Sequence, residues 1–109
     1  MEIIDNRFGA DTRVSARFER YQNGQLALEL VETETGEAWC TATVALPAGL
    51  PDDLIAIKSW SENEGMPEIL ERAGLIEGQP VQSVRSGFVQ IPVYRLTAVG
   101  SELARTQLE

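Results

Sequence analysis

The sequence predicts an α+β fold, in which a mainly antiparallel β-sheet of five or six strands has one principal α-helix packed on it. Apolar and polar residues alternate through three consecutive stretches of the first half, which is typical of half-buried strands. Glycine-containing turns at residues 22–24, 34–36 and 85–87 separate such stretches, as in β-hairpins. One stretch, residues 63–73, has helical periodicity instead.

The first two strands are expected over residues 13–21 and 25–32, on either side of Asn23-Gly24. A two-residue loop would set Phe18 opposite a glutamate. A three-residue loop with its glycine in the left-handed conformation sets Phe18 opposite Leu28, so the apolar faces of both strands agree. The same register pairs two charged residues on the outer face, Arg17 and Glu29.

The third strand is expected over residues 37–46, after a loop at Glu34-Thr35-Gly36. This register sets Cys40 opposite Leu30, so Cys40 is interpreted as a small buried apolar residue. A nucleophilic thiol would need a base or a cationic neighbour, and the predicted surroundings are apolar. Trp39 then falls on the opposite face of the sheet, where a helix or a partner could cover it.

The fourth strand, at residues 53–58, precedes the principal helix. Asn63 is the predicted N-cap, Pro67 is tolerable in the first turn, and the helix is expected to end near Ala73. Gly74 suits the left-handed position that closes a helix. The predicted buried stripe contains four residues, Met66, Ile69, Leu70 and Ala73.

A second hairpin is predicted over residues 81–84 and 88–97, with a loop at Arg85-Ser86-Gly87. Pro92 removes one donor from the ladder, which places its strand at an edge, a bulge or a short break. A single core is expected within residues 1–99, followed by a frayed helix or polar C-terminal tail at residues 100–109.

No stretch is apolar enough for a signal peptide or a membrane span. The single cysteine suits a reducing compartment. We therefore expect a cytoplasmic protein that does not engage a membrane.

The acidic residues gather in the middle of the chain, which has a net charge of −8. Residues 1–28 are neutral and residues 78–109 carry a net charge of +1, whereas residues 29–77 hold eleven acids against two bases. Direct nucleic-acid binding needs the opposite sign. A surface of this sign attracts basic proteins, although it also serves solubility.

The composition argues against an enzyme. The chain has no histidine, no nucleotide-binding glycine pattern and no calcium-loop spacing, so we expect no catalytic residues, no cofactor and no metal. Carboxylate neighbours such as Asp52-Asp53 and Glu62-x-Glu64 leave a metal-dependent hydrolase as a third hypothesis.

The first hypothesis is an inhibitor or adaptor that binds a basic host protein, such as a nucleic-acid-binding effector. The second is a structural or oligomerising module, such as a homodimer, that uses a strand edge or the Trp39 face. Trp60 is an additional candidate, because aromatic residues at loop junctions often anchor interfaces, although it could equally fill a gap between helix and sheet. The candidate contacts of the first hypothesis are Glu29, Glu32, Glu34, Glu37, Trp60, Glu62, Glu64, Glu68 and Glu71.

Turn and packing motifs follow one another in a distinctive order between residues 14 and 97. They are Asn23-Gly24 before a Leu-rich strand, V-A-L-P at 44–47, the acidic Trp60 junction, A-G-L at 73–75, R-S-G-F at 85–88 and P-V-Y-R-L at 92–96. This order resembles a small family of proteins of phages and conjugative elements. The resemblance implies an accessory protein of a mobile element, similar to anti-CRISPR and antirestriction inhibitors, and it supplies no catalytic residues.

Overall fold

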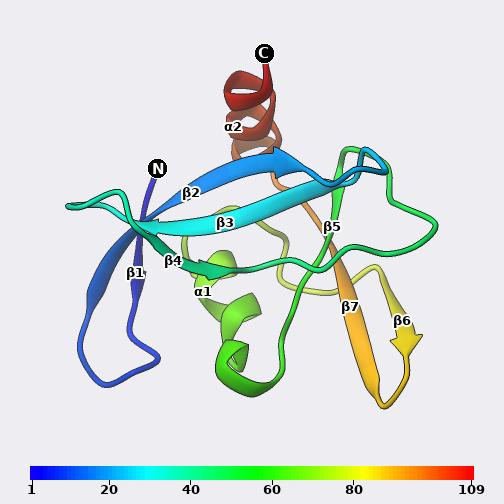
Figure 1. Cartoon of the computed structure of the whole chain (residues 1–109), viewed down its shortest axis with the longest axis horizontal. Coiled ribbons are helices and arrows are strands. Elements are labelled where there is room, and N and C mark those ends of the chain that lie inside the picture. The colour runs from blue at the N-terminus through cyan, green and yellow to red at the C-terminus, as the bar shows by residue number, and fades with distance from the viewer.

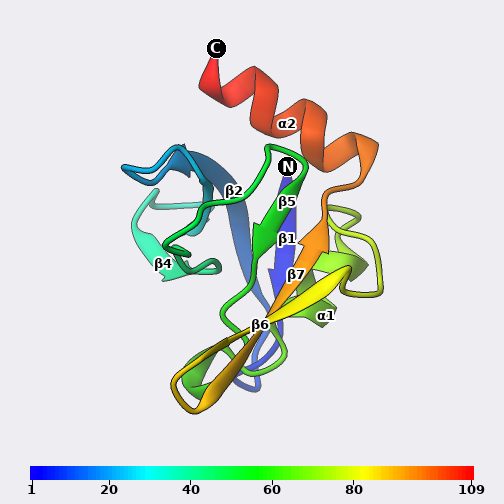
Figure 2. The same cartoon turned by 90° about the vertical axis from the view of Figure 1, so that its right-hand side faces the viewer.

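Two antiparallel sheets and two helices form the fold in the computed structural model, which describes residues 1–109. The α+β class is confirmed, although the structure has seven strands and a second helix (Figures 1 and 2). The first sheet has the order β1-β2-β3-β4 and the second has the order β5-β7-β6. The elements are β1 (Glu2–Asp5), β2 (Thr12–Arg20), β3 (Leu26–Glu32), β4 (Ala38–Thr41), β5 (Leu54–Ala56), the 3-10 turn η1 (Ser61–Asn63), α1 (Met66–Arg72), β6 (Gln82–Ser86), β7 (Val89–Arg95) and α2 (Ala98–Leu108).

The predicted register of the first hairpin is confirmed. Phe18 pairs with Leu28 and Arg17 pairs with Glu29 across β2 and β3. Gly24 closes the three-residue loop in the left-handed conformation, with φ of 88°. All three large apolar residues that β3 directs inward are buried, namely Leu26, Leu28 and Leu30.

The β3–β4 pair contains a β-bulge that the alternation did not predict. Leu30 pairs with Cys40 as expected, but Val31 pairs with Ala38, so Trp39 is an extra residue in β4. A bulge changes the direction of the inserted side chain. The prediction that Trp39 lies on the outer face is therefore wrong, because its ring packs against the main core. The loop is also one residue longer than predicted. The Glu32 N–H donates to the Glu37 carbonyl, so Thr33 belongs to the loop and not to the strand.

The two sheets meet where the chain beyond β4 pairs with the chain beyond β5. Thr43 bridges to Ile57 at this junction. Pro92 lies in the central strand of the second sheet, and β5 pairs with β7 only at residues 93–95. The missing N–H of Pro92 therefore falls just beyond the end of β5, where the Pro92 carbonyl accepts from the Ile57 N–H (3.0 Å).

The loop of the second hairpin is shorter than predicted. Ser86 pairs with Val89, so only Gly87 and Phe88 form the loop, and Gly87 has φ of 60°. This register sets Val84 opposite Ile91. The expected three-residue loop would set Val84 opposite Phe88 and separate it from Ile91. The two-residue loop is favoured because it brings Val84 and Ile91 together in the smaller core.

Helix α1 begins later than predicted and ends as predicted. Asn63 is not its N-cap; the side chain is buried and donates from Nδ2 to the Thr41 carbonyl (2.8 Å). Gly65 occupies the N-cap position with φ of 90°, which interrupts any helix running through from residue 63. At the other end Gly74 is left-handed and the Leu75 N–H donates to the Leu70 carbonyl (3.0 Å), as in a Schellman motif.

The last residues form helix α2, for which we expected a frayed helix or tail. The Thr97 side chain caps the helix by accepting from the Gly100 N–H (3.0 Å). Ala104 is buried in the main core, and the amide of Gln107 accepts from the Phe18 N–H (2.6 Å) and donates to the Ala16 carbonyl (3.0 Å). These groups of β2 lie beyond the part that β1 pairs with, so α2 covers this stretch of sheet edge.

The second sheet separates two apolar clusters. Its Ile55 and Tyr94 side chains face the main core, which the first sheet, α1 and α2 enclose. Its Ile91 and Val93 side chains face a smaller core, which the chain between β4 and β5 covers. Neither helix is long and apolar enough to cross a membrane.

Candidate protein-interaction surfaces

Carboxylates without a basic partner are the first candidates for contacts with another protein. Nine of the 17 carboxylates form ion pairs, and the other eight do not. The eight are Asp11, Glu32, Glu34, Glu37, Glu64, Glu68, Glu71 and Glu77. Six of them were among the predicted contacts, so negative charge is left unneutralised where the sequence placed it.

Two of the predicted glutamates are neutralised by neighbours. Glu29 pairs with Arg17 on the outer face of the first sheet, and Glu62 pairs with Lys58, four residues earlier in the chain. Trp60 is half-buried and packs against the smaller core. It therefore joins η1 to the second sheet, as in the packing interpretation.

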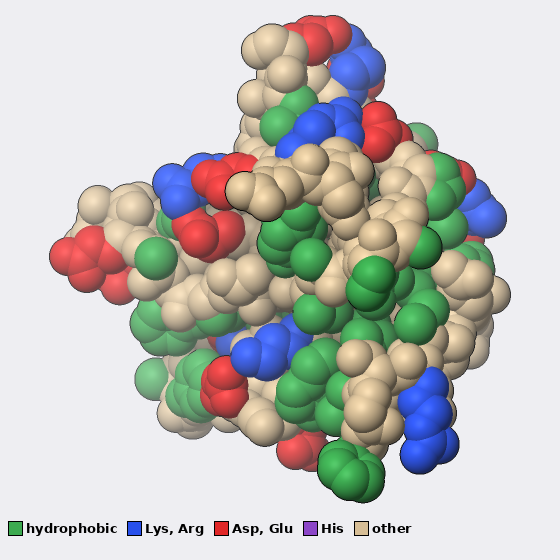
Figure 3. Space-filling model, turned by 45° about the vertical axis from the view of Figure 1, so that its right-hand side comes forward, with side chains coloured by type: hydrophobic (Ala, Val, Ile, Leu, Met, Phe, Trp, Pro, Cys, Tyr) green, Lys and Arg blue, Asp and Glu red, His purple; other side chains and the backbone are tan.

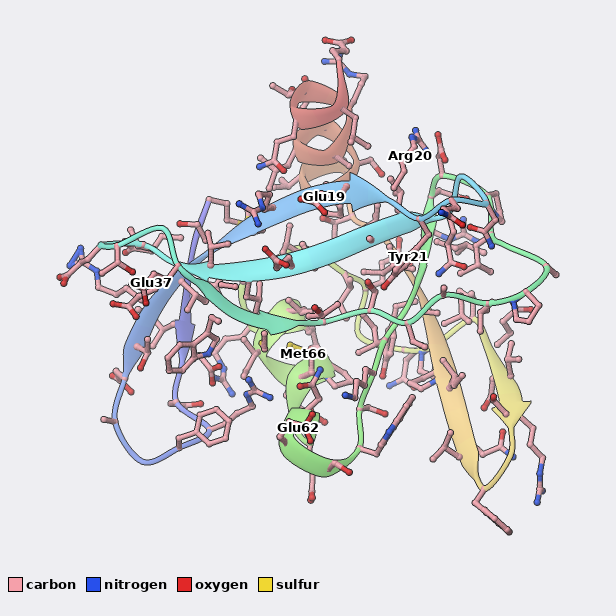
Figure 4. All side chains as sticks on the ribbon, viewed as in Figure 1. Glu19, Arg20, Tyr21, Glu37, Glu62 and Met66 are labelled. Carbon is pink, nitrogen blue, oxygen red and sulfur yellow. The ribbon has the colours of Figure 1, made fainter.

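The three glutamates of the β3–β4 turn form one acidic group, which we call the turn group, Glu32, Glu34 and Glu37. This turn protrudes beyond the sheet at one end of the molecule (Figure 4). Glu34 and Glu37 are exposed, and Gly36 completes the turn with φ of 75°.

A second acidic group follows α1 and the segments on either side of it. We call it the helix group, and it consists of Glu64, Glu68, Glu71 and Glu77. All four residues are exposed. Burial raises the pKa of the Tyr94 hydroxyl, and the negative charges of Glu68 and Glu71 raise it further. The Glu71 carboxylate also lies against Gly78, where an added Cβ would be 3.1 Å from it.

The predicted contacts thus lie in two groups on different elements. In Figure 4, Glu37 lies at the end of the β3–β4 turn and Glu62 lies at the foot of the molecule, next to α1. The β1–β2 loop lies between them, and there the Arg7 guanidinium lies over the ring of Phe8.

A polar cluster that the sequence did not predict surrounds the buried carboxylate of Asp5. Arg7 donates to it from the backbone N–H (3.0 Å), from Nε (3.0 Å) and from Nη2 (2.8 Å), and Trp39 Nε1 donates at 2.8 Å. Burial by itself would raise the pKa of Asp5, but the hydrogen bonds from Arg7 and Trp39 hold it below its ordinary value. The Arg7 Nη1 group donates to the Glu62 carbonyl (2.9 Å). The cluster therefore fixes the β1–β2 loop to β4 and η1.

Cys40 borders this cluster and is half-buried. Its Sγ atom accepts from Arg7 Nη2 at 3.6 Å. Burial raises the pKa of the thiol, and the nearby guanidinium offsets only part of the rise. The thiol is therefore protonated at neutral pH, as expected of a packing residue. The prediction of fully buried, apolar surroundings is wrong, because Cys40 is half-buried and has Arg7 as a cationic neighbour.

The β6–β7 hairpin is the least acidic part of the surface. No Asp or Glu occurs between Gly78 and Ser101. Phe88 at the hairpin tip is fully exposed, and Arg85 on β6 has no acidic partner. Hydrophobic side chains gather on the face that carries this hairpin (Figure 3). The long interval without acids was the only sequence signal for this surface.

A hollow beside α2 has a volume of about 440 Å³. Its charged lining groups are already paired with each other or with adjacent residues, as in the Arg20–Asp52 and Arg105–Glu109 ion pairs. No group of three or more His, Cys, Asp or Glu side chains is arranged to hold a metal ion.

Comparison with protein-family models, with curated proteins and with solved structures gives no match. The resemblance to proteins of phages and conjugative elements therefore stays a prediction.

Proposed function

We propose that this domain is a non-enzymatic inhibitor or adaptor that binds a basic protein surface through the helix group. The observation that carries the proposal is the exposure of Glu68 and Glu71 on one side of α1, with no basic side chain within ion-pair distance. Carboxylates without an ion-pair partner in the chain are available to the basic side chains of another protein. They attract basic surfaces and increase the rate of association.

The helix group suits this role better than the turn group. Met66, Ile69 and Leu70 fix α1 in the main core, so the glutamates of the opposite side are held in a constant arrangement. Charges on a helix that is anchored in this way lose little freedom on binding, whereas those of a protruding turn lose more.

The basic partner that this charge pattern fits is a protein that binds nucleic acid. Such proteins hold phosphates with arginine and lysine side chains, and carboxylates of similar spacing can occupy the same groove. An inhibitor of a restriction or CRISPR effector would act in this way. We propose that it acts in the cytoplasm, where Cys40 stays reduced.

DNA-cleavage inhibition tests the proposal. Purified restriction endonucleases and CRISPR nucleases are incubated with labelled DNA and increasing amounts of the domain. We expect inhibition of at least one nuclease, and the inhibition should weaken between about 50 mM and 200 mM salt. The double variant Glu68→Lys/Glu71→Lys should need more than about tenfold higher concentration, because each lost interfacial charge pair costs about 2 kcal/mol or more.

The double variant Glu34→Lys/Glu37→Lys is the matched control. It makes the same change of net charge in the turn group, and it should inhibit as the natural sequence does. Equal loss in both variants would show that only net charge matters, and a panel with no inhibited nuclease would reject the inhibitor function.

A further inference from the structure

Strand β6 presents an open edge. It is the last strand of its sheet, and β7 is its only paired neighbour. Residues 82, 84 and 86 pair with the residues of β7 whose backbone groups point toward β6. The backbone N–H and C=O groups of Ser83 and Arg85 therefore point away from the sheet, where no other strand lies.

This edge lacks the usual protection against pairing. Native edges are blocked by proline, by several charges or by a covering element. The free edge of β2 is covered in this way by Gln107 of α2. No helix covers β6, and Arg85 is its only charged residue.

The only charged side chain of β6, Arg85, has no acidic partner. Seven of the nine Lys and Arg side chains form ion pairs, and Arg85 is one of the two that do not. With no acid from Gly78 to Ser101, the chain itself supplies no local counter-charge. A partner with a carboxylate at this position would complete the pair.

Apolar side chains surround the same edge. Val84 is half-buried on the face of the smaller core, and Val81 and Phe88 are exposed at the two ends of β6. An added strand would place one set of alternate side chains beside Val84 and the other set beside Arg85.

We propose that β6 binds an extended acidic segment of another protein, which adds to the sheet as a further strand. The segment places an Asp or Glu opposite Arg85 and apolar residues on both sides of that acid, and Phe88 covers one end. This surface is separate from the helix group and does not depend on the function proposed for it.

A second copy of this chain fits the edge less well. Two β6 strands paired with each other would contain two Arg85 side chains and no carboxylate.

Selection from a library of random decapeptides tests this proposal. The natural chain should enrich sequences in which an acid alternates with apolar residues. The Arg85→Glu variant should lose about fivefold or more of its affinity for a selected acidic peptide, and a library selected on that variant should be enriched in Lys and Arg. The Ser83→Pro variant, which removes one outward N–H, should lose detectable binding, whereas Ser83→Ala should retain it.

Thermal unfolding of each variant identifies any that fails to fold, and Arg85→Glu leaves the backbone unchanged. The Glu68→Lys/Glu71→Lys variant should bind the peptides as the natural chain does. Three results would overturn the proposal: no enrichment, enrichment without an acidic preference, or a concentration-dependent dimer that Ser83→Pro abolishes.

Discussion

The indole Nε1 of Trp39 donates a 2.8 Å hydrogen bond to the carboxylate of Asp5, 34 residues earlier in the chain. This hydrogen bond depends on the bulge in β4, because the regular register would direct Trp39 to the other face of the sheet. The carboxylate also holds the Arg7 guanidinium, whose side chain is 7% exposed. This buried pair is the main polar link between the N-terminal loop and β4.

Replacing Asp5 by alanine should destabilise the fold strongly. The Arg7 guanidinium would stay buried without a counter-charge, which costs about 3–5 kcal/mol. Urea denaturation measures the change. Arg13→Ala, which breaks the exposed pair with Glu2, is the control and should have little effect. A similar decrease in unfolding free energy in both variants would show that the buried Asp5–Arg7 pair contributes no more than an exposed pair.

Stability should depend on the ionisation of Asp5. Because its pKa in the folded state is below the unfolded value of about 3.9, its contribution is present above that value and is lost as the pH falls through the folded pKa. The difference in unfolding free energy between the natural chain and Asp5→Asn should therefore be constant above about pH 5 and shrink at lower pH. A difference that grows on acidification would contradict this assignment.

Gly100→Ala should displace α2 from the sheet. An added Cβ at Gly100 would lie 2.4 Å from the Leu75 carbonyl oxygen, a backbone atom that also accepts from the Thr97 N–H (3.0 Å). We expect the free energy of unfolding to decrease by about 1–3 kcal/mol, which thermal unfolding measures. Gly78→Ala is the matched control, because its Cβ would meet only the mobile end of Glu71. An unchanged melting temperature in Gly100→Ala would show that α2 packs more loosely.

Gln107→Ala should open the edge of β2. The Phe18 N–H would lose its acceptor, which costs about 1–2 kcal/mol, and its amide hydrogen should exchange faster with solvent. Thr106→Ala, at an exposed neighbouring position, should leave the exchange unchanged. Equal exchange in both variants would mean that the bond contributes nothing.

Cys40 should react slowly with thiol reagents at about pH 8. Burial raises its pKa, so less thiolate is present than in a free cysteine, and the side chain is only partly exposed. The rate should rise to that of a free cysteine in denaturant. Rapid labelling of the folded protein would indicate an accessible thiolate.

The sequence predicted those parts of the fold that local residue patterns determine. The β2–β3 register followed from the alternation of apolar residues and from the position of Gly24. The end of α1 followed from Gly74, because few other residues adopt the left-handed conformation without strain. The extra residue at Trp39 could not be predicted, since a bulge changes no local propensity and is stabilised by Asp5 at a distance.

The candidate surfaces were predicted in part. Charge counting located the unpaired glutamates, but their division into two groups depends on where α1 and the β3–β4 turn lie in the fold. The hairpin surface is not among the predicted contacts, because the sequence pattern assigns Arg85 to a loop, whereas in the structure it lies on an open strand. A helix was one of the two alternatives for the last residues, but its packing on β2 could not be predicted, since its contacts involve residues about 90 positions away.

The Gln107 side chain completes the edge of β2 from an element that follows every strand in the chain. Because α2 is synthesised after every strand, part of the edge of nascent β2 stays uncovered until this helix has formed. Docking of α2, and not the pairing of the strands, would then be the step that protects the nascent domain from aggregation.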